Sequence, residues 1–262
     1  MRAPDPLATA LAAAREGAAV LLEYARRPLE IQEKGRRADI VTVADCASER
    51  VVIARLRSDF PNAAILAEES GVAPGTSDER WIIDPLDGTT NYAHGYPLYC
   101  VSIAYERAGE LLAGVVYAPA LDECYTAEHG GGARLGDRVL RVSSIDRVGD
   151  AMVCTGFHPA GYERNAQYFA RASGRAQAVR RDGSAALDLA FVACGRFDGF
   201  WEFDLHPWDV AAGTLLVREA GGSVTRVDGG PAQLDARSIL ATNGRIHAPL
   251  QGVLAGEDKQ AP

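Results

Sequence analysis

Residues 81–92 have the sequence Trp-Ile-Ile-Asp-Pro-Leu-Asp-Gly-Thr-Thr-Asn-Tyr, and this stretch decides how the rest of the chain is interpreted. Its apolar start is typical of the end of a buried strand. Asp84 and Asp87 follow, and we expect Pro85 and Gly88 to turn the backbone between these two carboxylates. Paired carboxylates suit a hard divalent cation, and the amides that come next suit phosphate oxygens. The stretch therefore predicts metal-assisted phosphoryl chemistry.

Two other interpretations of this stretch remain open at this point. Asp-Pro and Asp-Gly pairs are common turn formers, so the segment could be a structural turn that binds nothing. It could also hold the covalent nucleophile of a haloacid dehalogenase-type phosphatase, whose strand-end signature is Asp-x-Asp-Gly-Thr. The spacing here is Asp-x-x-Asp, which is one residue longer and fits that class poorly.

The composition is that of an ordinary globular enzyme. The chain has 262 residues, of which 47% are hydrophobic and 24% are charged. Its net charge of −8 argues against a nucleic-acid backbone as the main partner, although bound cations would still allow a phosphate ligand. The length predicts a single domain spanning 1–262, built of two packed halves at about 1–150 and 151–262.

The cysteine pattern argues against disulfides and zinc ribbons. The five cysteines form no Cys-x-x-Cys pair and their number is odd, so we expect a reduced, cytoplasmic protein. The N-terminal apolar segment is interrupted by Arg15, Glu16 and Glu23, which is typical of neither a signal peptide nor a membrane span. We therefore expect no membrane association.

Hydrophobic periodicity predicts helices and strands that do not alternate as a regular βαβ repeat. Apolar residues at helical spacing, with flanking Pro or Gly, predict helices at 7–25, 45–58, 165–173, 184–193 and 207–220. Short apolar runs predict strands at 64–67, 80–84, 98–104, 111–117, 178–179 and 198–203. Such a pattern favours mixed α/β packing in layers.

Further carboxylates lie at positions where they could share a site with Asp84 or simply be explained by local structure. Glu68 and Glu69 follow the strand that precedes the opening stretch, and only one of two adjacent carboxylates can face the same site as Asp84. Asp209 lies in the first turn of a predicted helix, where the helix dipole alone favours a carboxylate. Asp45 could similarly be a helix N-cap. Each position by itself has a sufficient structural explanation.

Taken together, these motifs resemble the signatures of the inositol monophosphatase family. They occur in that family's order and at its separations from about Lys34 to Gly222, which is most of the chain. The matching segments are Asp39-Ile40-Val41-Thr42 with Asp45, Glu68-Glu69, 81–91, Gly183-Ser184-Ala185-Ala186, 208–213 and 219–222. The resemblance implies a layered α/β/α/β/α sandwich, often a homodimer, that hydrolyses small phosphate monoesters with Mg²⁺ and is inhibited by Li⁺.

The resemblance also implies a set of metal ligands. Glu68, Asp84 and the backbone carbonyl of Leu86 would hold a first Mg²⁺. Asp84, Asp87 and Asp209 would hold a second, and Glu68 can contribute to a third, weaker ion. Carboxylates shared in this way allow metals on the order of 3.5–4 Å apart, the separation used in two-metal hydrolysis.

The same resemblance assigns the catalytic and phosphate-binding groups. The amides of Gly88 and Thr89 would bind the substrate phosphate. Glu68 and Thr89 would position and deprotonate the attacking water, with Asp45 in support, and no covalent phosphoenzyme would form. This sequence has Ala67 where the family usually has Gly, which is tolerable if the backbone there has negative φ.

The alcohol half of the substrate is expected to meet Asp87, Gly183, Ser184, Ala185, Glu202 and Asp209. A carboxylate such as that of Glu202 can accept hydrogen bonds from two hydroxyls, which favours a phosphorylated polyol such as inositol monophosphate. The alternatives are fructose-1,6-bisphosphatase or another sugar or nucleotide phosphatase of the same fold. A transcription-associated binding role is a further alternative, for which Arg180-Arg181 and 34–37 are the visible basic surface candidates.

Overall fold

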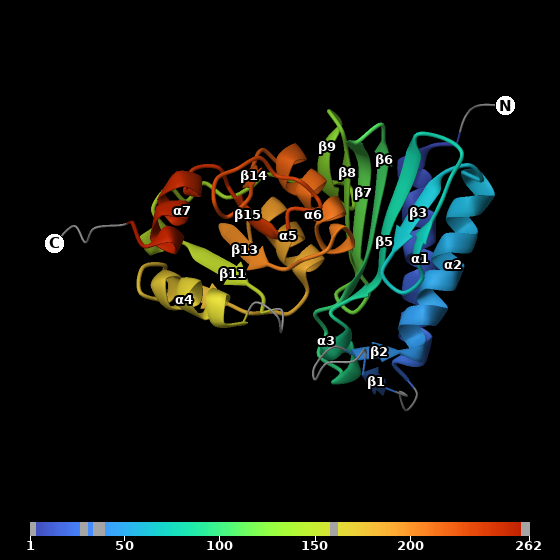
Figure 1. Ribbon diagram of the computed structural model, residues 1–262, viewed down its shortest axis with the longest axis horizontal. Helices are drawn as coiled ribbons and strands as arrows, with labels where there is room; N and C mark the ends of the chain where they lie inside the picture. The colour runs from blue at the N-terminus through green and yellow to red at the C-terminus, as the bar shows by residue number, and fades with distance from the viewer. Residues whose placement is uncertain (1–3, 27–30, 34–39, 158–161, 258–262) are drawn as a thin grey trace.

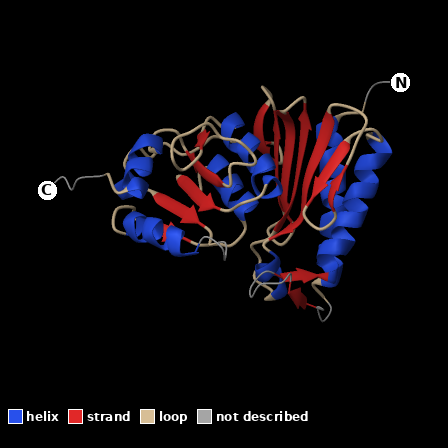
Figure 2. Ribbon diagram, in the orientation of Figure 1, coloured by secondary structure: helices blue, strands red, loops and turns tan. Residues whose placement is uncertain are grey.

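The computed structural model describes residues 4–26, 31–33, 40–157 and 162–257, and these form five layers (Figure 1). One pair of helices covers the outer face of a first sheet, a second pair lies between two sheets, and a third pair covers the second sheet, as the alternating colours of Figure 2 show. In that order the pairs are α1 (Pro6–Tyr24) and α2 (Val43–Asp59), α5 (Ala185–Ala193) and α6 (Pro207–Glu219), and α4 (Tyr162–Ser173) and α7 (His247–Ala255). The predicted α/β/α/β/α sandwich is confirmed.

The first sheet has eight strands in the order β10-β9-β8-β7-β6-β5-β3-β4, of which β3 and β5 form the parallel pair. Their register places Ala67 opposite Ile83, and the Glu68 amide donates to the Ile83 carbonyl oxygen at 3.2 Å. Glu68, directly after β3, and Asp84, within β5, therefore lie on neighbouring strands at the same edge of the sheet. The strands are β3 (Ala64–Ala67), β4 (Gly71–Ala73), β5 (Glu79–Asp87), β6 (Cys100–Arg107), β7 (Glu110–Ala118), β8 (Glu123–Glu128), β9 (Gly132–Leu135) and β10 (Arg138–Val139).

Alternating side chains of β5 enter two different hydrophobic cores. Trp81 and Ile83 pack beneath α1 and α2, whereas Ile82 points to the core that contains α5 and α6. Successive side chains of a strand point to opposite faces, so a central strand covered on both faces must be apolar at every position. This explains why the opening stretch begins with three consecutive apolar residues.

The second sheet has five strands in the order β12-β11-β13-β15-β14, with β11 parallel to both its neighbours and β15 antiparallel to both of its own. All nine residues of α5 are buried because this helix lies between the two sheets. At Gly213 of α6, an added Cβ would stand 2.5 Å from Leu189 Cβ, so the two middle helices pack closely there. The strands are β11 (Met152–Thr155), β12 (Ala178–Arg180), β13 (Gly199–Phe203), β14 (Ser223–Thr225) and β15 (Ser238–Thr242).

Short elements lie beside the end of β5. These are β1 (Ile31–Glu33), β2 (Ile40–Thr42) and α3 (Thr89–Ala93), and α3 contacts β2 (Figure 1). A 3₁₀ turn at Val148–Asp150 precedes the second sheet. Within the described ranges, no helix combines the length and apolar character that crossing a bilayer requires.

The structure corrects two local predictions. The backbone does not turn between Asp84 and Asp87, because β5 continues through both residues with an irregular register, and the turn comes at Gly88, where φ is +92°. Asp45 is not the N-cap of α2. Thr42 caps this helix, and the Asp45 carboxylate at the third helical position accepts from the Thr42 amide at 2.9 Å. The basic segment 34–37 lies outside the described residues.

Candidate active site

Four carboxylates from three separate elements influence one another at the edge of the first sheet. Asp84 and Asp87 belong to β5, Glu68 follows β3, and Asp209 lies in the first turn of α6. In the sequence, 141 positions separate the first and last of these residues, and only the layered packing brings them together. The carboxylates singled out from the sequence are therefore near neighbours in the fold.

Asp84 is the most deeply buried of these carboxylates, with 2% of its surface exposed. Its Oδ1 accepts a hydrogen bond from the Leu86 amide at 3.0 Å, which fixes the side chain. Burial raises the pKa of Asp84 well above its usual range, and the negative charges of Glu68, Asp87 and Asp209 raise it further. Without a cation, this carboxylate is unfavourable in its charged form.

Asp87 is held from the second half of the chain. Its Oδ2 accepts from the Ser184 hydroxyl and from the Ala186 amide, both at 2.7 Å. Burial raises the pKa of Asp87 to about 6, although the hydrogen bonds from Ser184 and Ala186 lower it. The predicted segment 183–185 thus lies directly against a predicted metal ligand.

Asp209 follows the same pattern at the start of α6. Its Oδ2 accepts from the His206 amide at 2.6 Å, which places the carboxylate at the helix N-terminus. Burial raises the pKa of Asp209 well above its usual range, and the negative charge of Asp87 is the next largest cause of this increase. The hydrogen bonds of Asp84 and Asp209 within the described residues use one oxygen each, so each has a second oxygen available to a cation.

A hydroxyl and a carboxylate form a short relay beside these ligands. Thr89 Oγ1 lies 3.1 Å from Asp45 Oδ1 and 3.0 Å from the Leu86 carbonyl oxygen, and both are acceptors. The Thr42 hydroxyl donates to Asp45 Oδ2 at 2.6 Å. Burial raises the pKa of Asp45, and the charge of Glu68 adds to that shift. The predicted trio Asp45, Glu68 and Thr89 is therefore assembled.

The turn at Gly88 requires a glycine for two reasons. Its positive φ disfavours other residues, and an added Cβ would stand 2.8 Å from the Leu98 carbonyl oxygen. Just beyond, the Asn91 amide donates to the carbonyl oxygens of Leu98 at 2.6 Å and Asp182 at 2.7 Å. Asn91 therefore joins α3 to the segment before β6 and to the loop before α5. Ala67, in contrast, lies in strand β3 and outside the positive-φ residues, as its substitution for Gly requires.

Glu202 lies in β13 with 7% of its surface exposed. Burial raises the pKa of Glu202 well above its usual range, and the charges of Asp209 and Asp87 add to the shift. Gly156 approaches this carboxylate so closely that any Cβ there would overlap it, and the Gly156 amide donates to Glu202. Gly156 was not predictable from the sequence, because a single glycine between Thr and Phe carries no distinctive signal.

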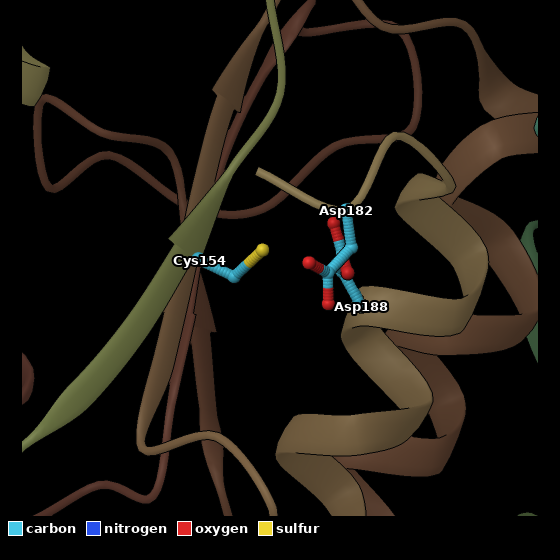
Figure 3. Close-up of side chains that lie close together, drawn as sticks. All are labelled: Cys154, Asp182 and Asp188. Atoms are coloured by element: carbon cyan, nitrogen blue, oxygen red, sulfur yellow. The ribbon is translucent and has the colours of Figure 1, made fainter. Parts of the chain in front are cut away.

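The donor set fits a hard divalent cation. Carboxylate and carbonyl oxygens are the ligands that Mg²⁺ prefers, and a cation would remove the mutual repulsion that raises the pKa values of Asp84, Asp87 and Asp209. The oxygens of these ligands do not all converge within 4.8 Å, however. Throughout the described part of the chain, one group of three potential ligands meets that distance, namely Cys154, Asp182 and Asp188 (Figure 3).

Comparisons with known proteins agree with this geometry. The model of the inositol monophosphatase family matches residues 4–257. An inositol-1-monophosphatase of Rhizobium meliloti is 47% identical over 230 residues, 86% of each chain, and the inositol monophosphatase of Anabaena superposes with a TM-score of 0.87 at 44% identity over 95% of each chain. A Nus factor SuhB of Pseudomonas aeruginosa is 41% identical over 251 residues, 92% of each chain.

The match is neither local nor limited to the fold. The matched residues include both halves of the chain. They therefore include the carboxylates of β5 and α6, and also the loop before α5 that Asn91 contacts. Members of this family are metal-dependent phosphatases that hydrolyse phosphate monoesters. The haloacid dehalogenase interpretation is thereby excluded, and the chain belongs to the inositol monophosphatase family.

Proposed function

We propose that this phosphatase hydrolyses the monophosphate ester of a small polyol, with myo-inositol monophosphate as the first candidate, in an Mg²⁺-dependent reaction without a covalent intermediate. One observation carries the proposal. Besides burial, the charges of Glu68, Asp87 and Asp209 raise the pKa of Asp84, and the charges of Asp87 and Glu68 raise that of Asp209, at the same edge of the sheet beside the Gly88 turn. Clustered carboxylates are suited to cations, and cations are suited to phosphate.

The proposed ligands are those that the sequence indicates. Asp84, Glu68 and the Leu86 carbonyl would hold one Mg²⁺, and Asp84, Asp87 and Asp209 a second, with room for a third, weaker ion at Glu68. Bound Mg²⁺ would supply an activated water and neutralise charge on the phosphate. The hydrogen bonds from the Leu86, Ala186 and His206 amides support this assignment, because they fix the ligand side chains before any ion binds.

The remaining chemistry would come from the protein's own groups. We propose that the amides of Gly88 and Thr89 orient the phosphate. Glu68 and the Thr89 hydroxyl would orient the attacking water in line with the leaving alcohol, and the proton would pass through Thr89 to Asp45. The 3.1 Å contact between Thr89 Oγ1 and Asp45 Oδ1 supports this route, as does the raised pKa of Asp45.

The alcohol would be selected on the second half of the chain. Glu202, Asp209 and the segment 183–185 present carboxylate oxygens, a hydroxyl and amides, which match the hydroxyls of a polyol. Phosphates of inositol, fructose, adenosine and histidinol should be compared at fixed Mg²⁺, with Li⁺ as inhibitor. We expect inositol monophosphate to give the highest kcat/KM and Li⁺ to inhibit. A higher kcat/KM for fructose 1,6-bisphosphate or 3′-phosphoadenosine 5′-phosphate would reassign the substrate.

The metal assignment is tested by Asp84→Asn and Asp209→Asn. Each should lower Mg²⁺-dependent turnover by at least about 100-fold, since removal of one oriented catalytic group typically costs that much. Asp228→Asn is the matched control, because Asp228 is exposed and pairs with Arg226 at 2.7 Å. Unchanged turnover in either ligand variant, with Mg²⁺ titrated to saturation, would show that these residues do not hold the catalytic ion.

A second role is favoured by one observation, the similarity to a protein named Nus factor SuhB. We propose that phosphatase activity is nevertheless the main function and that nucleic acid is not a partner, given the net charge of −8. Arg180 and Arg181 are exposed and remain the basic candidates within the described residues. Retention of RNA polymerase by the Asp84→Asn variant, and its loss in an Arg180→Ala/Arg181→Ala variant, would establish the regulatory role.

We also propose that the protein is a homodimer in the cytoplasm and that residues 1–262 form one domain of two packed halves. All five cysteines are free, which suits a reducing compartment. Light scattering coupled to size-exclusion chromatography measures the oligomeric state directly. A single unfolding transition in calorimetry is the result expected for one domain, whereas two separated transitions would divide it.

A further inference from the structure

A second cluster of potential ligands lies apart from the proposed catalytic carboxylates. Cys154 comes from β11, Asp182 precedes α5, and Asp188 belongs to the first turn of α5. The Cys154 sulfur and one oxygen of each aspartate all lie within 4.8 Å of one another. Figure 3 shows the three side chains pointing into a common space between the strand and the helix. The proposed function uses none of these three side chains.

Asp188 makes this cluster more than a group of acidic residues. Only 1% of its surface is exposed, and among the described residues the one side chain that donates towards its carboxylate is the weak Cys154 thiol, itself a member of the cluster. Buried carboxylates normally accept several hydrogen bonds, and a buried charge without such compensation is strongly unfavourable. The carboxylates that act on Asp188 most strongly belong to Asp182, Glu202 and Asp87, and all of them repel it. A positive partner is needed in this space.

We propose that Cys154, Asp182 and Asp188 bind one thiophilic divalent cation of the Zn²⁺ class. A thiolate and two carboxylates are a ligand set that Zn²⁺ accepts and Mg²⁺ does not, because Mg²⁺ prefers oxygen ligands only. Three protein ligands leave a fourth tetrahedral position for water. On binding, the Cys154 thiol loses its proton to solvent, and the resulting sulfur–metal bond replaces the sulfur–hydrogen bond.

The dimensions of the cluster permit this ion. Ligand atoms around a tetrahedral Zn²⁺ are about 3.4–3.8 Å apart, from bond lengths of about 2.0–2.3 Å. Since the three ligand atoms all lie within 4.8 Å of one another, binding requires them to approach by at most about 1.4 Å. The Asp182 side chain can make this movement, because Asp182 is partly exposed whereas Cys154 and Asp188 are buried. The same exposure gives the ion access from solvent.

Protonation of Asp188 is the competing explanation. Burial raises the pKa of Asp188 well above its usual range and raises that of Cys154 as well, so a neutral acid beside a neutral thiol would also avoid the buried charge. A proton, however, leaves the second Asp188 oxygen without a partner and gives Asp182 no role. Direct metal titration separates the two explanations.

Chelator-treated protein should be titrated with Co²⁺ in excess Mg²⁺, so that the oxygen-rich catalytic site is filled by Mg²⁺. We expect one equivalent of Co²⁺ to produce a thiolate-to-cobalt charge-transfer band in the near ultraviolet, and Zn²⁺ to displace it. Cys154→Ser should abolish the band. Asp188→Asn should weaken Co²⁺ binding at least about tenfold, as loss of a ligand or its support does. Cys46→Ser is the matched control, because Cys46 is exposed and should leave the band unchanged.

Asp182→Asn keeps the test decisive if the buried variants fail to fold. Asp182 is partly exposed, and Asn91 contacts its backbone carbonyl rather than its side chain. This variant should therefore fold, as circular dichroism can verify, and should lose at least about tenfold in Co²⁺ affinity. No charge-transfer band in the wild-type protein, a band that survives Cys154→Ser, or unchanged affinity in Asp182→Asn would each overturn the proposal.

Discussion

Replacement of Asp87 by Asn should stabilise the metal-free protein while it removes Mg²⁺-dependent turnover. Burial raises the pKa of Asp87 from 3.8 to about 6, so the charged carboxylate opposes folding. The shift corresponds to about 3 kcal/mol of folding free energy. Asn keeps an oxygen that can accept from Ser184 and Ala186, so the substitution removes the charge and retains these contacts.

The sign and the pH range of this effect follow from the two pKa values. Below pH 3.8 Asp87 is protonated in both states and costs nothing. As the pH rises towards 6, the unfolded state loses its proton first, so the free energy of unfolding falls, and the loss is complete above the folded-state value. Asp87→Asn should therefore raise Tm by about 5 °C at pH 8 and by little at pH 4, given about 2.1 cal/mol/K of unfolding entropy per residue.

Scanning calorimetry in EDTA at these two pH values is the appropriate assay. Asp228→Asn serves as the control, because this exposed aspartate should leave Tm unchanged. A lower or unchanged Tm for Asp87→Asn at pH 8 would refute the reasoning that the charge of Asp87 opposes folding when the metal has been removed by EDTA. Addition of Mg²⁺ should raise the wild-type Tm more than that of the variant, since only the wild-type protein keeps the full ligand set.

Three further substitutions test separate parts of the structure. Asn165→Ala removes the acceptor of the buried Trp201 Nε1–H at 2.7 Å along with two other hydrogen bonds, and chemical denaturation should show a loss of about 3 kcal/mol. Gly88→Ala places a side chain at φ +92° and 2.8 Å from the Leu98 carbonyl oxygen, so it should lower Tm and turnover together. Asp45→Asn should reduce kcat about 100-fold with Mg²⁺ affinity nearly unchanged, because Asp45 is assigned a proton and not an ion. A large loss of Mg²⁺ affinity would instead make Asp45 a ligand, and wild-type stability in the first two variants would contradict their contacts.

Most of the long, strongly patterned elements were predictable from the sequence, whereas several of the shorter ones were not. The helices α1, α2, α5 and α6 and the strands β3, β5, β6 and β7 appear close to their expected positions. The sequence pattern did not predict β8, β11, β14, β15 and α7, which are three to nine residues long. A short strand such as Met152–Thr155 carries too few residues for a period to show, and its partners come from distant parts of the chain.

The sequence indicated which carboxylates form the candidate site, but it did not indicate the local structural role of each residue around them. Asp84 and Asp87 stood out as paired carboxylates at a strand end, whereas Glu68 and Asp209 were assigned as ligands only through the resemblance to the family's motifs. The Asp45 prediction was wrong in its structural part because any residue of the first helical turn can take part in a cap, and only the structure shows that Thr42 holds the N-cap position. Asp188 gave no signal, since an aspartate within an apolar helical run has no partner that sequence spacing can reveal.

The order of the layers has a consequence during protein synthesis. The eight-stranded sheet is complete at Val139, and α1 and α2, which cover one of its faces, precede it in the chain. The helices that cover its other face end only at Glu219, roughly 80 residues later. At a synthesis rate of about 5–20 residues per second, that apolar face remains uncovered on the nascent chain for about 4–16 s. Ribosome-bound chains halted before α5 therefore present a broad apolar sheet face, and a slower ribosome lengthens the time in which neighbouring chains can associate through it.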